Sequence, residues 1–233
     1  MARTPDKITE QHLLRWSEML SALARTGLAF TESLYEQERF EEILGVAAEI
    51  QAGSSLPVDA EQLVTEWTKT IGHGVPGYVT PKVTVGAIVG NDAGEILLVK
   101  RADSGIWLYP TGWADVGYSA AEVAVKEVWE ETGIQSEVNQ LLSVLDGMRL
   151  GFTRIPLYSV VFHLRATGGE LKAHPLECED VGFFAEDDLP EPMYSAERWA
   201  PQAFAAIRGE DVRVSFDGIR RPPWEESEHA ESE

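Results

Sequence analysis

Three glutamates lie close together in the sequence, at a spacing that places them on one side of a helix. Glu127 and Glu131 are one helical turn apart, and Glu130 lies close to both. Like charges at this spacing destabilise a helix by about 0.2–0.5 kcal/mol, so a compensating charge is expected. Mg²⁺ prefers oxygen ligands and keeps places for water and phosphate beside one or two carboxylates. The pattern is therefore typical of a divalent-metal site, and equally of a solvated acidic helix face.

The helix that carries these glutamates has recognisable start and stop signals. Ser119 and Glu122 form a capping box, and Gly133 suits the position just after the last helical residue. Between them, apolar residues recur at helical spacing and should face a core: Ala121, Ala124, Val125 and Val128. The sequence predicts a helix over about 120–132 with one apolar and one acidic face.

The glutamates belong to a longer motif that resembles the Nudix box. That box reads Gly, five residues, Glu, seven residues, Arg-Glu, an aliphatic residue, any residue, Glu-Glu, any residue, Gly and an aliphatic residue. Seven of its nine specified positions are matched here: Gly112, Glu127, Val128, Glu130, Glu131, Gly133 and Ile134. Tyr118 stands in place of the first Glu and Lys126 in place of the Arg. Lysine keeps the charge of arginine but lacks its bidentate fork of donors.

The resemblance extends beyond the box, over roughly residues 10–215. The segments around Trp16, 26–28, 38–41, 77–82 and 181–184 are similar to bacterial Nudix hydrolases that carry an N-terminal helical domain. The resemblance implies an α/β fold, the Nudix α/β/α sandwich with a mixed sheet, preceded by a small all-α domain. That subgroup includes enzymes acting on CDP-choline and ADP-ribose.

The implied activity is hydrolysis of the pyrophosphate bond of a nucleoside diphosphate linked to another group, with Mg²⁺ as cofactor and Mn²⁺ as a substitute. The implied metal ligands are three carboxylates and one backbone carbonyl: Glu127, Glu130, Glu131 and Gly112. One of these glutamates, or a downstream carboxylate, would take the proton from the attacking water. Glu179 and Glu177 precede a predicted strand and are the downstream candidates, although each is also consistent with a surface carboxylate.

Aromatic and basic residues near the motif are candidates for contacting the substrate. Trp113 follows Gly112 directly and could stack on a base, as could Trp107 and Tyr118, although core packing explains these aromatics equally well. A phosphate contact is predicted for Arg101, which ends a strand before the motif, with Arg149 and Arg154 as weaker candidates.

Periodicity divides the chain into a helical part and a mixed part. Helical spacing predicts three helices at the N-terminus, the first stopped by Gly27 and the third capped by Asp59 and Gln62 and reaching Ile71. Downstream, apolar β-branched runs predict strands over 83–89, 96–99, 141–145, 157–164 and 181–184, with a last helix over 197–208. The predicted domains are 1–72 (helical), 73–81 (linker), 82–215 (Nudix) and 216–233 (acidic tail, partly disordered).

Composition narrows the range of partners and compartments. The formal charge of −20 argues against binding duplex nucleic acid, whereas a small nucleotide could be admitted by a bound cation. Cys178 is the single cysteine, and the sequence shows neither a secretory signal nor an apolar run long enough for a membrane helix. We therefore expect a cytoplasmic protein, and a homodimer from the resemblance and the apolar faces of the first segment.

Two other functions remain open from the sequence. A Nudix-like sensor would bind a metabolite such as ADP-ribose without cleaving it, although such proteins usually lose the glutamates of the box. A nucleoside triphosphatase of the MutT kind would share the box but would not need the N-terminal helices.

Overall fold

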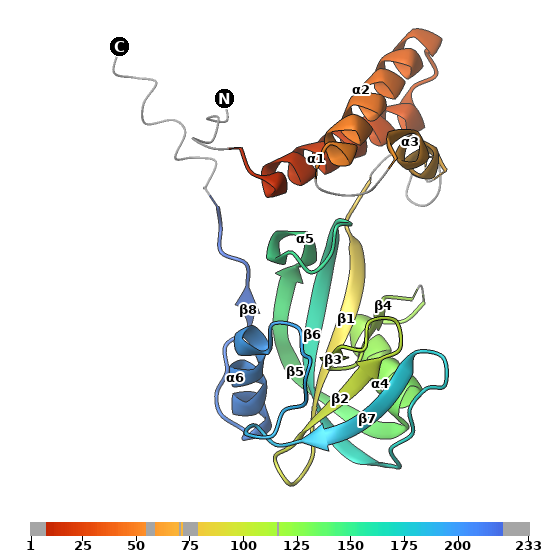
Figure 1. Cartoon of the computed structure of the whole chain (residues 1–233). Coiled ribbons are helices and arrows are strands. Elements are labelled where there is room, and N and C mark those ends of the chain that lie inside the picture. The colour runs from red at the N-terminus through yellow and green to blue at the C-terminus, as the bar shows by residue number, and fades with distance from the viewer. Residues whose placement is uncertain (1–7, 55–58, 70, 72–78, 116, 221–233) are drawn as a thin grey trace. The chain divides into compact units, whose positions relative to one another are not determined.

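The computed structural model describes residues 8–54, 59–69, 71, 79–115 and 117–220, and these form two compact units (Figure 1). One unit contains the N-terminal helices and the segment Gly151–Pro156, and the other contains Lys82–Leu150 and Leu157–Ile219. Most of the predicted linker (73–81) and of the predicted acidic tail (216–233) lies outside the described residues. The sheet unit continues past the predicted boundary at residue 215.

The helical unit consists of three helices: α1 (Glu10–Phe30), α2 (Leu34–Ala52) and α3 (Ala60–Thr68). The prediction that Gly27 stops the first helix is wrong, because α1 continues to Phe30. A Cβ at Gly27 would overlap the ring of Phe40, so this glycine allows α1 and α2 to approach closely. Asp59 caps α3 as predicted by accepting from the Gln62 amide, but α3 ends before Ile71.

The interface between α1 and α2 buries polar side chains among its apolar ones. Ser17 donates to the Ala47 carbonyl at 2.7 Å and to the Gln51 side chain at 3.1 Å. Glu18, on the same helix, is only 8% exposed, and burial raises its pKa to about 7 while Arg25 lowers it. A buried carboxyl thus makes the stability of this unit depend on pH.

The variant Glu18→Gln should remove part of that dependence. Since the folded-state pKa lies above the unfolded value, the folded protein binds the proton more tightly, and the cost of burying the charge is absent below pH 4.5 and complete above about pH 7. At pH 8 the variant should be more stable than wild type by about 3 kcal/mol, and at pH 4 the two should be equal. Urea denaturation at the two pH values measures this, and an equal difference at both would contradict it.

The sheet unit is built on one mixed sheet of strands, flanked by helices. Its main path runs β3-β2-β1-β6-β5-β8, while β4 pairs with β1 and β7 with β2. The strands are β1 (Lys82–Gly90), β2 (Ile96–Arg101), β3 (Trp107–Leu108), β4 (Thr111–Trp113), β5 (Ile134–Asp146), β6 (Leu157–Gly169), β7 (Cys178–Phe184) and β8 (Ser215–Phe216). The central pair β1–β6 is parallel in register from Lys82–Leu157 to Gly90–Arg165, and most other pairs are antiparallel.

Helices cover the two faces of this sheet, so the unit has the predicted α/β/α layering. One core forms between the sheet and α4 (Ala120–Thr132), with Val123, Ala124 and Val128 of the helix fully buried. The other core lies against α6 (Ala196–Ile207), whose Phe204 is among the most buried side chains. A short helix, α5 (Gly147–Leu150), follows β5. No helix among the described residues combines the length and apolarity needed to cross a membrane.

Candidate metal and catalytic site

The acidic helix and the loop before it are held by local signals that the sequence predicts. Ser119 accepts from the Glu122 amide while the Glu122 carboxylate accepts from the Ser119 amide, so the capping box is formed. Gly133 ends α4 in the left-handed region, with φ of 73°. The apolar face of α4 packs on the sheet, and this packing determines where its other face points.

Two of the three glutamates lie against β4. A Cβ at Gly112 would overlap the Glu127 carboxyl group, so the absence of a side chain there lets that carboxylate lie on the strand. Glu131 accepts a hydrogen bond from the Thr111 amide at 3.1 Å. The side chains of Glu127 and Glu131 are therefore aimed at the backbone that carries Gly112, as the Nudix-box resemblance implies.

Burial and neighbouring carboxylates raise the pKa values of Glu127 and Glu131. Glu131 is 3% exposed, and its pKa is raised to about 8, mainly by desolvation and then by Glu127, against smaller lowering effects from the Thr111 amide and Arg101. Desolvation also raises the pKa of Glu127, and Glu130 and Glu177 add to the rise. A divalent cation would relieve both the repulsion and the burial penalty, so the donor set fits one chemically.

Lys126 supplies positive charge beside Glu127 and Glu130. Its Nζ lies 2.7 Å from Glu130, 3.3 Å from Asp115 and 3.7 Å from Glu127. These carboxylates raise the pKa of Lys126, so it stays charged. Lys126 takes the position of the box arginine and, as a compact cation, bridges carboxylates on the loop and on the helix. Sequence reasoning missed Asp115, although its place inside the motif was visible.

The three glutamates do not form a preformed ligand shell. Within the described part of the chain, no three His, Cys, Asp or Glu side chains are grouped closely enough to hold a metal ion. The reason is electrostatic, because Glu130 turns to Lys126 while Glu131 turns to the Thr111 amide. For all three to share one cation, Glu130 would have to leave Lys126, which it can do because it lies on the exposed face.

Of the two downstream carboxylates, Glu177 is the one that acts on the cluster. Its charge raises the pKa values of both Glu127 and Glu131, and its backbone carbonyl accepts from the Ala102 amide at 2.9 Å. Glu179 is instead in an ion pair with Lys100 at 2.7 Å. The geometry therefore favours Glu177 over Glu179 as the downstream base.

The residues predicted to contact the substrate lie in different parts of the sheet unit. Arg101 lowers the pKa of Glu131 and so lies near the cluster, but its guanidinium also forms a two-point pair with Asp103 at 2.7 and 3.0 Å. Arg149 lies on α5 and donates to the carbonyl of Gly218, so its predicted phosphate contact stays a prediction. Trp107 is buried in the core against Phe184, which excludes it as a stacking platform.

Trp113 is the aromatic side chain best placed for a ligand. It is 50% exposed, and Lys82 Nζ lies 5.4 Å from its ring centroid. Side chains alternate along a strand, so Trp113 points to the sheet face opposite the one where Gly112 meets Glu127. A ligand that touches both would have to cross the edge of β4. Lys82 is a second residue that sequence reasoning missed, since a lysine at the start of a strand carries no signal.

The chain matches two protein-family profiles. The NUDIX domain profile matches residues 80–205, more than half of the chain. The chain belongs to the Nudix family. A second profile, described as a UDP-X-like, N-terminal oligomerisation domain, matches residues 11–63. The predicted family and the α/β Nudix fold with its helical N-terminal domain are confirmed, and this Nudix protein is a hydrolase.

Several relatives resemble this Nudix hydrolase over most of their length. Protein YjhB of Bacillus subtilis (strain 168), provisionally assigned as an ADP-ribose pyrophosphatase, is 32% identical over 208 residues, which are 88% of this chain and 96% of YjhB. A UDP-X diphosphatase crystal structure shares 26% identity with a TM-score of 0.53, covering 90% of this chain and 100% of that one. An ADP-ribose pyrophosphatase from Streptococcus suis 89-1591 shares 36% identity with a TM-score of 0.52, covering 59% and 100%.

Replacing Lys126 tests its electrostatic role in this Nudix site. Lys126 lowers the pKa of Glu127, so in Lys126→Met that pKa should rise, and the acidic limb of the pH–activity profile should move to higher pH. Activity at neutral pH should fall by about tenfold. The variant Lys126→Arg restores the charge and should keep the limb where wild type has it. A Lys126→Met profile that superimposes on the wild-type profile would show that Lys126 has no such role.

Proposed function

We propose that this protein hydrolyses the pyrophosphate bond of a nucleoside diphosphate linked to a second group, releasing a nucleoside monophosphate and a phosphorylated second group. The observation that carries the proposal is the buried Glu131, which lies beside Glu127 at β4 with its pKa raised to about 8. A buried, undercompensated carboxylate pair is costly for folding alone and is typical of a functional site. The protein is proposed to work as a homodimer in the cytoplasm.

Four residues are proposed to hold the metal ion, and a fifth to orient them. The backbone carbonyl of Gly112 and the carboxylates of Glu127, Glu130 and Glu131 would hold Mg²⁺, or Mn²⁺ in its place. When bound, the cation neutralises the diphosphate and lowers the pKa of a water molecule. Lys126 orients the glutamates through its ion pairs.

Other residues are proposed to accept the proton of the attacking water and to contact the substrate. Glu177, or one of the box glutamates, takes the proton of the attacking water, and Glu179 is the less favoured candidate because of its pair with Lys100. Trp113 would stack on the base. Arg101 would contact a phosphate after leaving Asp103, and Arg149 remains a weaker candidate for a phosphate contact.

The names of the relatives guide the choice of substrates. ADP-ribose is named for two of them and a UDP-linked compound for a third. CDP-choline is retained because the N-terminal helical subgroup includes enzymes acting on it. We therefore propose the class nucleoside diphosphate-X, with ADP-ribose, UDP-linked and CDP-linked compounds as its first candidates.

A substrate panel tests this proposal. The full-length protein is incubated with ADP-ribose, UDP-glucose, CDP-choline, NADH and dGTP, each with Mg²⁺, with Mn²⁺ and with excess EDTA, and the products are identified by mass spectrometry. Cleavage of a diphosphate-X compound to a nucleoside monophosphate, abolished by EDTA, supports the proposal. If dGTP is the only compound cleaved and pyrophosphate is released, the protein has the MutT-like activity. If a compound binds but none is cleaved, the protein is the sensor. Either result overturns it.

A further inference from the structure

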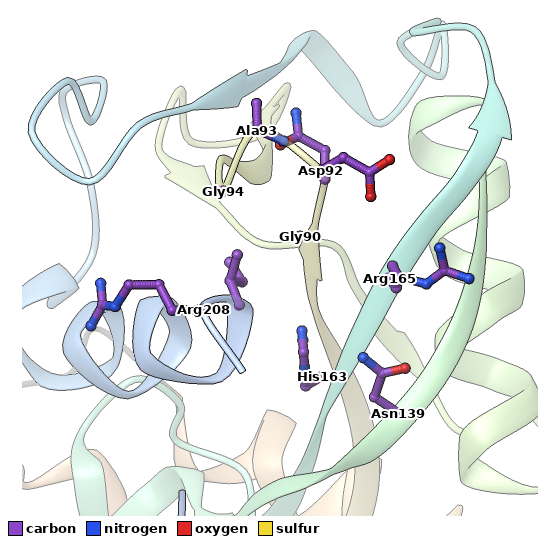
Figure 2. A pocket seen from close by; sticks show the side chains of 10 residues that line it. Gly90, Asp92, Ala93, Gly94, Asn139, His163, Arg165 and Arg208 are labelled. Atoms are coloured by element: carbon purple, nitrogen blue, oxygen red, sulfur yellow. The ribbon is translucent and has the colours of Figure 1, made fainter. Parts of the chain in front are cut away.

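A second cavity lies in the sheet unit, far from the glutamates. Its volume is about 380 Å³, within the range of small-molecule sites (Figure 2). The cavity opens between the carboxyl end of β1, the turn after it, β5, β6 and the end of α6. It is lined by Gly90, Asn91, Asp92, Ala93, Gly94, Asn139, His163, Arg165, Ile207 and Arg208. Gly90 and the β4 partner Thr84 are six residues apart on β1, so the two sites are separated by about 20 Å along the strand.

His163 lies at the base of this cavity as a buried polar group. Its side chain is only 6% exposed, and it lines the cavity. Figure 2 shows the ring directed into the cavity toward Gly90. Burial lowers the pKa of His163, so the imidazole is neutral and offers one donor and one acceptor. Because the ring lines the cavity, its nitrogens are open to a ligand or to water.

Asn139 stands beside His163 because of an irregularity in the sheet. The β5–β6 register shifts between Val138 and Gln140, so Asn139 is the extra residue of a bulge next to the position of His163. Its carboxamide adds two donors and one acceptor oxygen at the wall of the same cavity (Figure 2). Bulges commonly redirect a side chain toward a functional site.

The charges around the cavity oppose an anionic ligand. Arg165 pairs with Glu137 at 3.4 Å, and Arg208 pairs with Glu186 at 2.6 Å and Glu210 at 2.7 Å. In Figure 2 the guanidinium groups of Arg165 and Arg208 point away from each other, to opposite sides of the view. Asp92 is the one carboxylate among the described lining residues, and the three carboxylates paired with the two arginines lie outside the lining and neutralise their charges.

An uncharged, flat, hydrogen-bonding ring matches this lining. His163 and Asn139 present mixed donors and acceptors, and asparagine amides pair with the edges of nucleobases. Ile207 offers an apolar surface, and it packs so closely on Gly90 that a Cβ there would lie 2.8 Å from Ile207. The described residues that line the cavity include no Trp, Tyr or Phe, so a bound base would lie against Ile207 rather than stack on an aromatic ring.

We propose that this cavity is a second ligand site, which binds the base of an uncharged nucleoside through His163 and Asn139. The surrounding carboxylates would exclude the corresponding nucleotides, so the site discriminates against phosphorylated forms. This proposal does not depend on the activity of the Nudix site.

Histidine ring signals provide a direct test. The full-length protein, labelled with ¹⁵N-histidine, is titrated with adenosine, guanosine, cytidine and uridine to millimolar concentration, and then with their 5′-monophosphates. At least one nucleoside should move the His163 ring signals in a saturable way, and its monophosphate should bind about tenfold more weakly. His163→Phe identifies the signals by removing them.

A variant of Asn139, whose side chain is exposed, tests nucleoside binding without disturbing the fold. Asn139→Leu leaves the core unchanged, so the protein should melt as wild type does while the nucleoside affinity falls at least about tenfold. Glu131→Gln, in the Nudix site, should leave the His163 shifts as they are. The proposal is overturned if no nucleoside moves the His163 signals, if monophosphates bind as tightly as nucleosides, or if Asn139→Leu binds like wild type.

Discussion

Glu131→Gln should reduce turnover of a nucleoside diphosphate-X substrate by about a thousandfold or more while leaving the folded protein as stable as wild type. The glutamine oxygen can still accept from the Thr111 amide, as Glu131 does at 3.1 Å. Because the pKa of Glu131 is about 8, the wild-type side chain is largely neutral near pH 7, and a neutral amide costs the fold little. The lost property is the negative charge that a cation requires.

Two measurements separate the effect of Glu131→Gln on turnover from its effect on stability. Initial rates of nucleoside monophosphate release give the loss of turnover, and urea denaturation in EDTA should give a free energy of unfolding within about 1 kcal/mol of wild type. Glu197→Gln, an exposed glutamate in the first turn of α6, is the matched control and should change neither quantity. Wild-type turnover in Glu131→Gln would remove Glu131 from the metal site.

Gly169→Ala should destabilise the sheet unit by about 3 kcal/mol or more. Gly169 ends β6 with φ of +90°, and a Cβ there would overlap the carbonyl of Gly133, the residue that ends α4. Backbone is the obstacle, so no side-chain rotation can relieve the clash. The end of the acidic helix would have to move away from β6, and activity should fall together with stability.

Gly209→Ala is a matched control for the backbone strain. Gly209 also has a positive φ, +77°, but a Cβ there would meet no atom within 4 Å. It should therefore cost only the strain of a left-handed alanine, about 1 kcal/mol. Thermal and urea unfolding of the two variants measure the difference, and equal losses would show that the Gly133–Gly169 approach is not tight.

The parts of the fold with short-range signals were predictable. The α4 capping box and the Gly133 stop are local, and both are confirmed. The prediction that Gly27 ends the first helix was wrong because the role of this glycine depends on Phe40 from another helix, which no local pattern reveals. The strand β4, only three residues long, was missed because it forms through pairing with β1 rather than through its own composition.

The sequence predicted part of the candidate site, but not its geometry. Gly112, Glu127 and Glu131 come together as the motif implies, because helix spacing and the loop before it set their positions. Glu177 and Asp115 act on the cluster through space, and their contribution depends on a tertiary arrangement absent from any spacing rule. Likewise, the sequence could not show that Trp107 is buried while Trp113 is half exposed.

The parallel β1–β6 pair constrains how this chain can fold during synthesis. The partner of Val85 in β1 is Val160, so the centre of the sheet cannot form until the ribosome has added the long segment between them. By contrast, α1 and α2 are consecutive and need only a short loop. We expect the helical unit to form first, while β1, with its run of buried apolar residues, can pair with β2 and β4 but lacks its β6 partner and is vulnerable to aggregation.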